Sequence, residues 1–429
     1  MAFKEIPSKT ARQKVCLKLY KEAGFGGTLE AATGFGKTHV AIMFLLRLFA
    51  FLNYTPKVLV VVDSSYLRDQ WYEELGFWKI EGIDVKIINT VIKSKHVVDL
   101  LILDEIHGYV AEKFGMVFHM VTYKWILGLT ATIDIDDEKN AIIAARCPIF
   151  DVVPLSECRE NGWVSEFTVY NLALSLSPVD RIAYDKASKQ FNIGFAIFNH
   201  QFPLMMSCLS NRSDAEEHAV RLYKDPTRYG EIMGAARRAN GAMQRRKDIL
   251  YNARIKVETA VQLAGMFPNK KILYFSQSTQ MAEDVNDGIN DAWGEISVSY
   301  HSEVKGEESK TERTKTGKPK RIGSKDVRKN RIQRLLRPDD SIRILSAAKA
   351  LDQGADIDGI DMGCITSGNS TQRQTVQRIG RIIRYKDNKH AIIVDLYIND
   401  TQDFKWLKSR QKMIPKNCIR WISNIKDVI

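Results

Sequence analysis

Short apolar runs alternate with stretches of helical periodicity over residues 26–153. The runs KVLVVV (57–62), VVDLLIL (97–103) and WILGL (125–129) have the length of strands. Apolar strands that are separated by helices are typical of a parallel sheet buried on both faces. The pattern therefore predicts one α/β domain over residues 1–153.

The C-terminal part of the chain repeats this pattern over residues 267–429. Five further apolar runs read as buried strands: KILYFS (271–276), ISVSY (296–300), IRILSA (342–347), MGCITS (362–367) and AIIVDLY (391–397). Residues 154–177 read as a connector that leads to a strand, and residues 178–266 as a helical segment rich in Arg. The sequence predicts two tandem α/β domains with a helical insertion between them.

One stretch, residues 303–331, is polar and nearly free of apolar residues. From residue 305 to residue 331 it contains eleven Lys or Arg against four Asp or Glu. Such a composition cannot bury enough apolar surface to fold on its own, and it predicts a basic loop or a disordered arm in the second domain.

Charge and cysteine content narrow the class of protein. The 429-residue chain has a formal net charge of +12, which suits a polyanionic partner such as nucleic acid but also a generally basic soluble protein. The six cysteines are scattered without a C-x-x-C pair, so we expect no zinc site and reduced thiols in the cytoplasm. The most apolar run, residues 40–52, is too short to cross a bilayer and carries Arg47, so we expect no membrane segment.

The stretch ATGFGKT (32–38) has the context of a phosphate-binding loop, between a strand and a helix. Gly34 and Gly36 would let backbone N–H groups turn toward phosphate oxygens, and Lys37 would reach the β- and γ-phosphates. The Thr38 hydroxyl would bind Mg²⁺. The first position of the G-x-x-x-x-G-K-T pattern is Ala31, and an accidental glycine loop is the alternative interpretation.

A second motif strengthens the nucleotide hypothesis. The apolar run before residue 104 is followed by DEIH (104–107), which begins with two adjacent acidic residues. Asp104 would bind Mg²⁺ and Glu105 would orient or deprotonate the attacking water. An acidic turn that caps a strand is the alternative. In GLTAT (128–132), Thr130 and Thr132 would link the nucleotide site to another surface, although a plain turn explains them equally well.

The stretch QRQTVQRIGRIIRY (372–385) gathers polar side chains over about two helical turns. Gln377, Arg378, Arg381 and Arg384 cluster there, and arginine is suited to stabilising charge on a transferring phosphoryl group. The alternative is a solvated basic helix face. Gly380 argues against that alternative, since glycine inside a helix costs about 1 kcal/mol relative to Ala and needs a reason such as a close approach.

These motifs, in this order, resemble those of superfamily 2 helicases of the DExH type. The stretches AATGFGKT, DEIH, LTAT and QRIGRIIR match motifs I, II, III and VI, and A-x-T-G-x-G-K-T is a usual form of motif I in this superfamily. Weaker matches, to motifs Ia, Ib, IV and V and to the adenine-contacting element before motif I, are VVVDSSYLRDQW, INTVIK, LYFSQSTQMAE, LSAAKALDQGADI and TARQ. The resemblance covers nearly the whole chain and implies two RecA-like domains.

The resemblance also implies roles for individual residues. ATP with Mg²⁺ would lie between the domains, and Gln377, Arg381 and Arg384 would reach across to its γ-phosphate. His107 would couple hydrolysis to the interface between the domains. Further residues would contact the nucleotide, namely Gln13, Thr33, Gly354 and Asp356. One nucleic-acid strand would be held by Ser64, Ser65, Thr90 and Lys349.

Within the superfamily, GLTAT, KALDQGADID and the connector most resemble DNA translocases and repair helicases, above all the recombination and branch-migration helicases of tailed phages. The resemblance implies an ATP-dependent DNA helicase that unwinds or remodels forks and Holliday junctions in phage replication, recombination or repair, in the host cytoplasm and compatible with a monomer. Selectivity for branched DNA would come from the basic stretch 303–331 or the Arg-rich helices near 234–256. The alternatives are an RNA helicase, an ATP-gated clamp that does not translocate, and a motor subunit that needs a nuclease or methylase partner.

Overall fold

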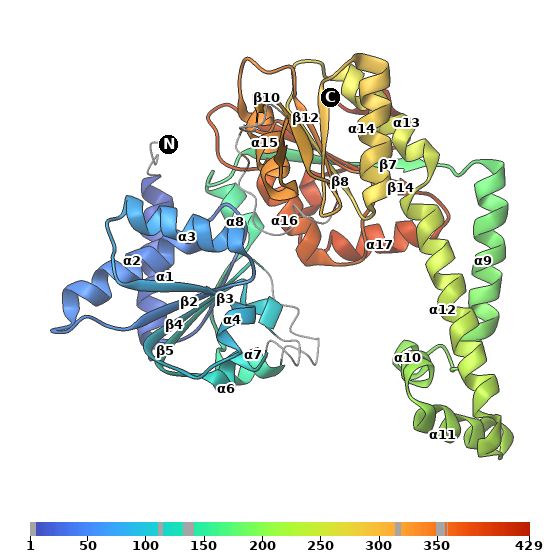
Figure 1. The fold of residues 1–429 in the computed structure, drawn as a ribbon, viewed down its shortest axis with the longest axis horizontal. Coiled ribbons are helices and arrows are strands. Elements are labelled where there is room, and N and C mark those ends of the chain that lie inside the picture. The colour runs from blue at the N-terminus through green and yellow to red at the C-terminus, as the bar shows by residue number, and fades with distance from the viewer. Residues whose placement is uncertain (1–5, 110–114, 132–140, 314–318, 349–356, 358) are drawn as a thin grey trace.

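A computed structural model describes residues 6–109, 115–131, 141–313, 319–348, 357 and 359–429. Figure 1 shows two α/β domains side by side and a long helical projection from the second. None of the helices in the described residues is both long and apolar enough to span a membrane.

The first domain contains a six-stranded parallel sheet with the strand order β3-β2-β4-β5-β1-β6. The strands are β1 (Gly26–Ala31), β2 (Val58–Val62), β3 (Ile83–Ile87), β4 (His96–Asp104), β5 (Val121–Thr130) and β6 (Ile149–Val153). Its helices are α1 (Pro7–Glu22), α2 (Lys37–Phe51), α3 (Ser65–Phe77), α4 (Ile88–Val91), η1 (Ile106–Tyr109), α6 (Val117–Met120) and α7 (Ala141–Arg146), followed by α8 (Leu155–Glu160).

The burial of β2 explains why its sequence is uninterruptedly apolar. Val58, Val60 and Val62 belong to the core on one face of the sheet, whereas Leu59 and Val61 belong to the core on the other face. Since successive side chains of a strand point to opposite faces, a sheet covered on both sides needs apolar residues at every position. The three apolar runs predicted as strands in this domain all lie in the sheet, in β2, β4 and β5.

The second domain contains a seven-stranded parallel sheet with the order β15-β7-β14-β13-β8-β12-β9. Its strands are β7 (Glu166–Leu174), β8 (Ile272–Ser276), β9 (Ser297–Tyr300), β12 (Ile344–Ala348), β13 (Met362–Ile365), β14 (His390–Ile398) and β15 (Ile419–Ile422). The helices are α13 (Arg254–Met266), α14 (Thr279–Trp293), α15 (Ser324–Leu336), α16 (Gln372–Ile382), α17 (Gln402–Arg410), η5 (Lys416–Cys418) and η6 (Ile425–Asp427). The prediction of two parallel-sheet domains flanked by helices is confirmed.

Two elements that precede residue 267 pack with the second sheet. Strand β7, at the end of the predicted connector, pairs along its whole length with β14. Helix α13, at the end of the predicted helical segment, buries Ala260 and Leu263 in the same core as Tyr274 of β8. The second domain therefore draws on the chain before and after the helical insertion.

The helical insertion forms a projection that we call the arm, residues 178–251 (Figure 1). It consists of α9 (Pro178–Ala196), α10 (Phe202–Ser210), α11 (Arg212–Tyr223), η3 (Pro226–Arg228) and α12 (Tyr229–Tyr251). Helices α9 and α12 form the stalk and pack closely, since a Cβ atom added at Gly194 would lie 2.9 Å from the Cβ of Ala239. The distal end has its own small core, which includes Phe198, Met205 and Ile232.

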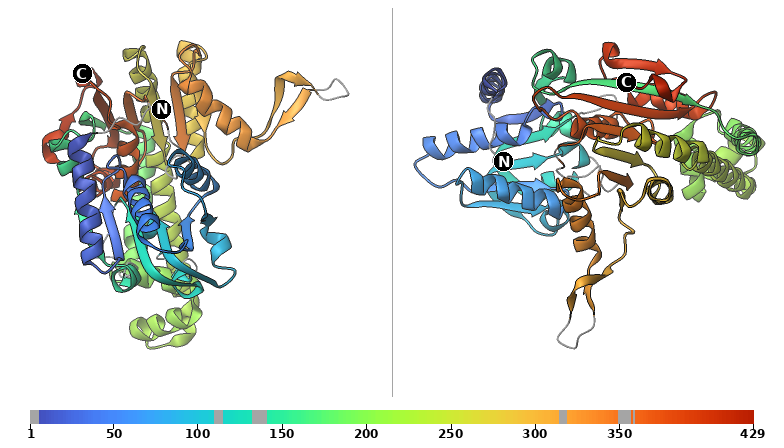
Figure 2. Two further views of the ribbon diagram at one scale, coloured as in Figure 1. Left: turned by 90° about the vertical axis from the view of Figure 1, so that its left-hand side faces the viewer. Right: turned by 90° about the horizontal axis from the view of Figure 1, so that it is seen from above.

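The basic stretch differs from the predicted loop. Strands β10 (Glu307–Arg313) and β11 (Pro319–Ile322) pair antiparallel, with Glu307 opposite Ile322. The hairpin projects away from the second domain, and α15 follows it (Figure 2). Antiparallel pairing satisfies the backbone without an apolar face, and the sequence pattern therefore gave no sign of these strands.

Candidate nucleotide-binding site

A cleft of about 1020 Å³ lies between the two domains, at the carboxyl ends of the first sheet's strands. Ligands of parallel α/β sheets commonly bind at this edge, and the volume suits a nucleotide. The first domain contributes Thr33, Gly34, Gly36, Lys37, Thr38, Asp63, Asp104, Glu105 and His107 to its lining. The second domain contributes Arg373, Gln374, Gln377, Arg381 and Arg384.

The loop between β1 and α2 has the backbone of a phosphate site. Gly34 and Gly36 have φ angles of +95° and +89°, in a region that side chains rarely adopt. The loop ends at Lys37, the first residue of α2, so the helix N-terminus faces the cleft. Ala31 is the last residue of β1 and is fully buried, so a glycine is not required at that position for a turn.

Side chains from α1 and from the segment after α8 hold this loop. Gln13 donates from Nε2 to the Phe35 carbonyl at 2.8 Å, and Lys9 donates from Nζ to the Gly34 carbonyl at 2.5 Å. A Cβ atom at Gly34 would lie 3.0 Å from Val164. The sequence named Gln13 for a contact with the nucleotide, which stays a prediction, and it missed Lys9, which lies one helical turn before Gln13 on the same face of α1.

The acidic pair follows β4. Asp104 is the last residue of the strand, and its Oδ2 accepts a hydrogen bond from Trp71 Nε1 at 2.8 Å. Burial, followed by the charge of Glu105, raises the pKa of Asp104 to about 6, and Trp71 and Lys37 oppose this shift. Asp63, at the end of β2, lies in the same cleft, and burial also raises its pKa. A lone Asp after a strand gave no sequence signal.

Glu105 is held in an unusual conformation. Its φ is +51°, which a non-glycine residue rarely adopts, and its buried Oε2 has no hydrogen-bond partner among the described residues. The carboxylate oxygens of Glu105 and Asp104 and the Thr38 hydroxyl lie in the same cleft, and together they form a set of oxygen ligands that fits Mg²⁺. The Glu105 carboxylate also has the acceptor capacity that a water-orienting group needs.

His107 connects this acidic pair to β5. Its Nδ1 shares a hydrogen bond with the Thr130 hydroxyl at 2.7 Å and lies 3.3 Å from Glu105 Oε2. Burial and the positive charges of Arg373 and Lys37 lower the pKa of His107 well below its usual value. The imidazole is therefore neutral, and its contact with Glu105 is not an ion pair.

The second-domain wall is one face of α16. Arg373, Gln377 and Arg381 follow one another at intervals of four residues, which places them along one stripe of α16. Arg384 lies two residues beyond the end of that helix and also lines the cleft. Burial lowers the pKa of Arg384, with Tyr66 opposing, but a guanidinium stays charged. Arg373 was missed, although the same periodicity extended by one turn would have found it.

Arg378 does not belong to this wall. Its guanidinium donates to the carbonyl oxygens of Ser367 and Ser276 at 3.1 and 3.2 Å, and its side chain is 1% exposed. The sequence grouped Arg378 with its neighbours because they are close in the chain. One residue along a helix is a rotation of about 100°, which turns Arg378 into the domain core.

The two domains meet directly at Gly380. A Cβ atom at this position would lie 2.3 Å from the Cβ of Thr33, in the phosphate loop. The chain segment between the domains contacts the same two regions. Val164 packs against Gly34, and Ser165 donates from its backbone N–H to the Ile383 carbonyl and from Oγ to the Arg384 carbonyl, each at 2.8 Å. The close approach that the sequence suggested for Gly380 is an approach to the phosphate loop.

The predicted nucleic-acid contacts lie beside the cleft rather than in its lining. The Ser64 hydroxyl accepts a hydrogen bond from Leu67 N–H and caps α3, of which Ser65 is the first residue. Thr90 lies in α4 and is exposed. Four predicted site residues fall outside the described residues: Thr132, Lys349, Gly354 and Asp356.

We expect Asp104→Asn to raise the melting temperature of the nucleotide-free protein at pH 8. The pKa of Asp104, about 6, lies above its ordinary value of 3.8, so burial disfavours the ionised form and stability falls as the pH rises from about 4 through 6. The difference corresponds to about 3 kcal/mol at pH 8, and an amide oxygen can still accept from Trp71.

Thermal melts at pH 5 and pH 8 without Mg²⁺ measure this effect, and the gain should shrink at pH 5. Asp99→Asn is a control of opposite sign, because hydrogen bonds from Lys124 and from the Lys57 N–H hold the pKa of Asp99 below its ordinary value. A gain for Asp104→Asn that is equal at both pH values would contradict the assignment.

Comparisons with known proteins agree with this geometry. The family model "Type III restriction enzyme, res subunit" matches residues 7–96, and the model "Helicase conserved C-terminal domain" matches residues 255–386. The DNA 3'-5' translocase XPB2 of Sulfurisphaera tokodaii is 24% identical over 404 residues, which cover 90% of this chain and 81% of that protein. The putative ATP-dependent RNA helicase L396 of Acanthamoeba polyphaga mimivirus is 28% identical over 143 residues, 28% of this chain and 26% of that protein.

Solved structures share the fold at low sequence identity. The Type ISP restriction-modification enzyme LlaBIII bound to DNA has a TM-score of 0.58 and 13% identity, with 98% of this chain but only 31% of that enzyme covered. A putative HsdR subunit of a type I restriction enzyme from Vibrio vulnificus has a TM-score of 0.57 and 14% identity over 96% of this chain and 68% of that one. Dbp5 of S. cerevisiae bound to RNA has a TM-score of 0.56 and 12% identity over 96% of this chain and 89% of that one.

The fold is that of two tandem RecA-like domains. The two family matches and the XPB2 relative support an ATP-driven enzyme of the superfamily 2 helicase class.

Proposed function

We propose that the protein is a DExH-type, ATP-dependent DNA translocase that unwinds or remodels branched DNA, such as forks and Holliday junctions. The observation that carries this proposal is the two-sided cleft, in which the phosphate loop and acidic pair of one domain face the arginine stripe of the other. The XPB2 relative, named as a DNA 3'-5' translocase, supports DNA as the track and 3′→5′ as the direction. The proposed setting is DNA replication, recombination or repair of a tailed phage, in the host cytoplasm.

Each group in the cleft has a proposed task. The backbone N–H groups of Gly34 and Gly36 and the Lys37 ammonium bind the phosphates, and Thr38 and Asp104 hold Mg²⁺. Bound Mg²⁺ would neutralise negative charge on the phosphate oxygens. Glu105 orients the attacking water and accepts its proton. Arg381 and Arg384, with Gln377, stabilise the charge of the transition state from the opposite domain.

Hydrolysis is coupled to domain motion in this proposal through contacts that cross the cleft. Gly380 rests on Thr33, and the Ser165 hydrogen bonds tie the end of α16 to the segment between the domains. The His107–Thr130 hydrogen bond joins the acidic pair to β5. A change at the phosphates therefore shifts α16, and the first-domain contacts at Ser64, Ser65 and Thr90 and the predicted contact at Lys349 would step along one strand.

Steady-state ATPase and strand displacement on forks, Holliday junctions, plain duplex DNA and RNA test the proposal. We expect branched DNA to stimulate hydrolysis most and to be unwound, and Lys37→Ala to be inactive on every substrate. Stronger stimulation by RNA would favour an RNA helicase instead. DNA-stimulated hydrolysis without displacement of strands or of a triplex would favour an ATP-gated clamp.

A further inference from the structure

Helix α12 carries a seven-residue repeat in the stalk of the arm. Residues 234–240 read GAARRAN and residues 241–247 read GAMQRRK, so glycine and arginine recur at the first and fifth places. Seven residues are close to two helical turns, and the equivalent residues of the two copies therefore lie on one face of the helix. Gly234 and Gly241 are partly exposed, and Arg238 and Arg245 are exposed.

Gly234 leaves room for the Arg238 guanidinium, and Gly241 lies at ordinary contact distance from Arg245. A Cβ atom at Gly234 would lie 3.2 Å from Nη1 of Arg238, and one at Gly241 would lie 3.5 Å from Nη1 of Arg245. Each guanidinium thus folds back along the helix over the glycine one turn earlier. Packing against α9 does not require these glycines, because buried alanines such as Ala239 form that contact. Each glycine costs the helix about 1 kcal/mol relative to Ala, and at Gly234 the missing Cβ atom is what allows the Arg238 guanidinium to lie where it does.

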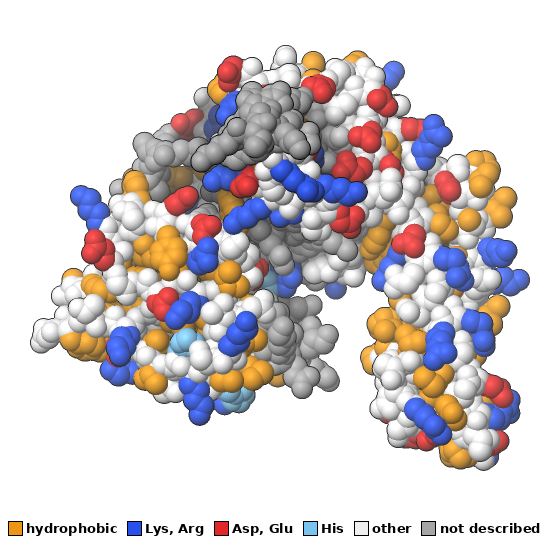
Figure 3. Space-filling view, viewed as in Figure 1, with side chains coloured by type: hydrophobic (Ala, Val, Ile, Leu, Met, Phe, Trp, Pro, Cys, Tyr) orange, Lys and Arg blue, Asp and Glu red, His pale blue; other side chains and the backbone are white. Residues whose placement is uncertain are grey.

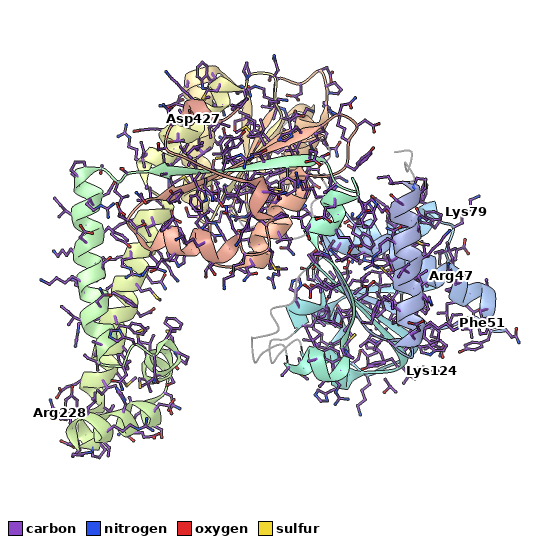
Figure 4. The ribbon with its side chains drawn as sticks, turned by 180° about the vertical axis from the view of Figure 1, so that it is seen from behind. Arg47, Phe51, Lys79, Lys124, Arg228 and Asp427 are labelled. Carbon is purple, nitrogen blue, oxygen red and sulfur yellow. The ribbon has the colours of Figure 1, made fainter. Side chains whose placement is uncertain are left out.

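The arginines of α12 differ from those at the distal end of the arm in whether they form ion pairs. At the distal end, Arg212 pairs with Glu216, Arg221 with Glu217 and Arg228 with Glu231. Figure 4 labels Arg228 at that end of the arm. By contrast, four arginines of α12 form no ion pair with a carboxylate in the described part of the chain, namely Arg237, Arg238, Arg245 and Arg246. On the neighbouring helix α9, Arg181 lies 3.9 Å from Asp185.

Polar contacts within the stalk leave this positive charge uncompensated. Arg245 donates to the side-chain oxygen of Gln190 at 3.0 Å, and the Arg246 guanidinium lies over the Phe191 ring at 4.5 Å. Neither partner is charged. Like charges that are held close together repel one another, and an external polyanion would relieve that repulsion.

We propose that this face of α12, centred on Arg238 and Arg245, binds the phosphate backbone of the double-stranded part of the DNA substrate. The inference rests on the proposed function and adds a second DNA site outside the ATP cleft. The seven-residue spacing puts the two anchor points about 10.5 Å apart along the helix, and a guanidinium matches phosphate oxygens in a bidentate geometry. The arm projects clear of the first domain, with Lys and Arg side chains on its surface (Figure 3).

The composition of the face favours a duplex over a single strand. Single-strand sites combine basic side chains with aromatic rings on which bases stack, and residues 230–250 contain no aromatic residue. Two packed helices are also a rigid support, which suits the regular phosphate spacing of a duplex. Backbone contact of this kind is independent of base sequence and is weakened by salt.

The test compares Arg238→Gln/Arg245→Gln with Arg212→Gln/Arg221→Gln, which removes the same charge from the distal end. Binding to a fork with a long duplex and to a short single strand is measured by fluorescence anisotropy over a salt series, together with basal ATPase. For the stalk variant we expect the Kd for the fork to rise roughly tenfold and the salt slope to fall by about 2, with single-strand binding and basal ATPase unchanged. The distal variant should match the wild type.

A second variant, Gly234→Ala, keeps every charge but adds a Cβ atom 3.2 Å from Nη1 of Arg238, so that guanidinium must shift to make room for it. It should weaken fork binding while raising the melting temperature of the arm. Unchanged fork binding in the stalk variant, or an equal loss of fork binding in the distal variant, would overturn the proposal. It would also be overturned if the stalk variant kept its binding to the fork but lost binding to an acidic protein. A wild-type protein that binds no DNA would instead refute the proposed function itself.

Discussion

Glu105→Gln is expected to lower DNA-stimulated ATP turnover by roughly 10²- to 10⁴-fold while leaving ATP binding intact. The carboxylate faces the cleft from a backbone with a φ of +51°, and its buried Oε2 accepts no hydrogen bond from the described residues. The amide has the same shape but cannot take up the proton of an attacking water. Removing one negative charge from beside Asp104 should not weaken the binding of phosphates by Lys37.

Steady-state ATPase at saturating DNA and equilibrium binding of a fluorescent ATP analogue separate the two effects. Glu81→Gln is the matched control, because Glu81 is exposed and lies before β3, away from the cleft. Turnover near the wild-type value in Glu105→Gln would show that another group positions the water. Loss of nucleotide binding would show that Glu105 contributes to binding of ATP rather than to the hydrolysis step.

The sequence predicts the parts of the site that local pattern determines. Val58–Val62 reads as a strand because both faces of β2 are buried, and the phosphate loop reads from its glycines because only they tolerate its backbone angles. The acidic pair can be recognised in the sequence because it stands at the end of the apolar run that forms β4. In each case one short stretch carries both the element and its chemistry.

The remaining features depend on contacts between distant parts of the chain. Asp63 and Arg373 are ordinary charged residues until the folded domains bring them into one cleft. Ser165 reads as a connector residue, and only the structure shows it bonded to the end of α16. Strand β15 lies at the edge of the sheet, where β7 is its neighbour among the described strands, and its four residues are partly or fully exposed. A search for buried apolar runs therefore misses it.

Gly380→Ala is expected to lower DNA-stimulated ATP turnover by about 100-fold, although it adds a single methyl group. The new Cβ would lie 2.3 and 2.4 Å from two carbon atoms of Thr33, whereas carbon atoms in contact are about 3.5–4.0 Å apart. Helix α16 must therefore retreat from the phosphate loop by more than 1 Å, taking Arg381 and Arg384 with it. A displacement of that size at a reacting group costs on the order of 10²-fold in rate.

The loss in Gly380→Ala should appear in kcat and not in folding, since alanine favours the helix by about 1 kcal/mol over glycine. Gly76→Ala in α3, where a Cβ meets nothing within 4 Å, is the control and should keep full turnover. The three atoms nearest to the new methyl group, at 2.3–2.9 Å, all belong to the Thr33 side chain, so Thr33→Gly removes these close contacts. In that background, adding Gly380→Ala should change turnover less than about twofold. An equal loss in both backgrounds would mean that α16 fails for a reason other than its contact with the phosphate loop, and that closure of the cleft does not depend on this glycine.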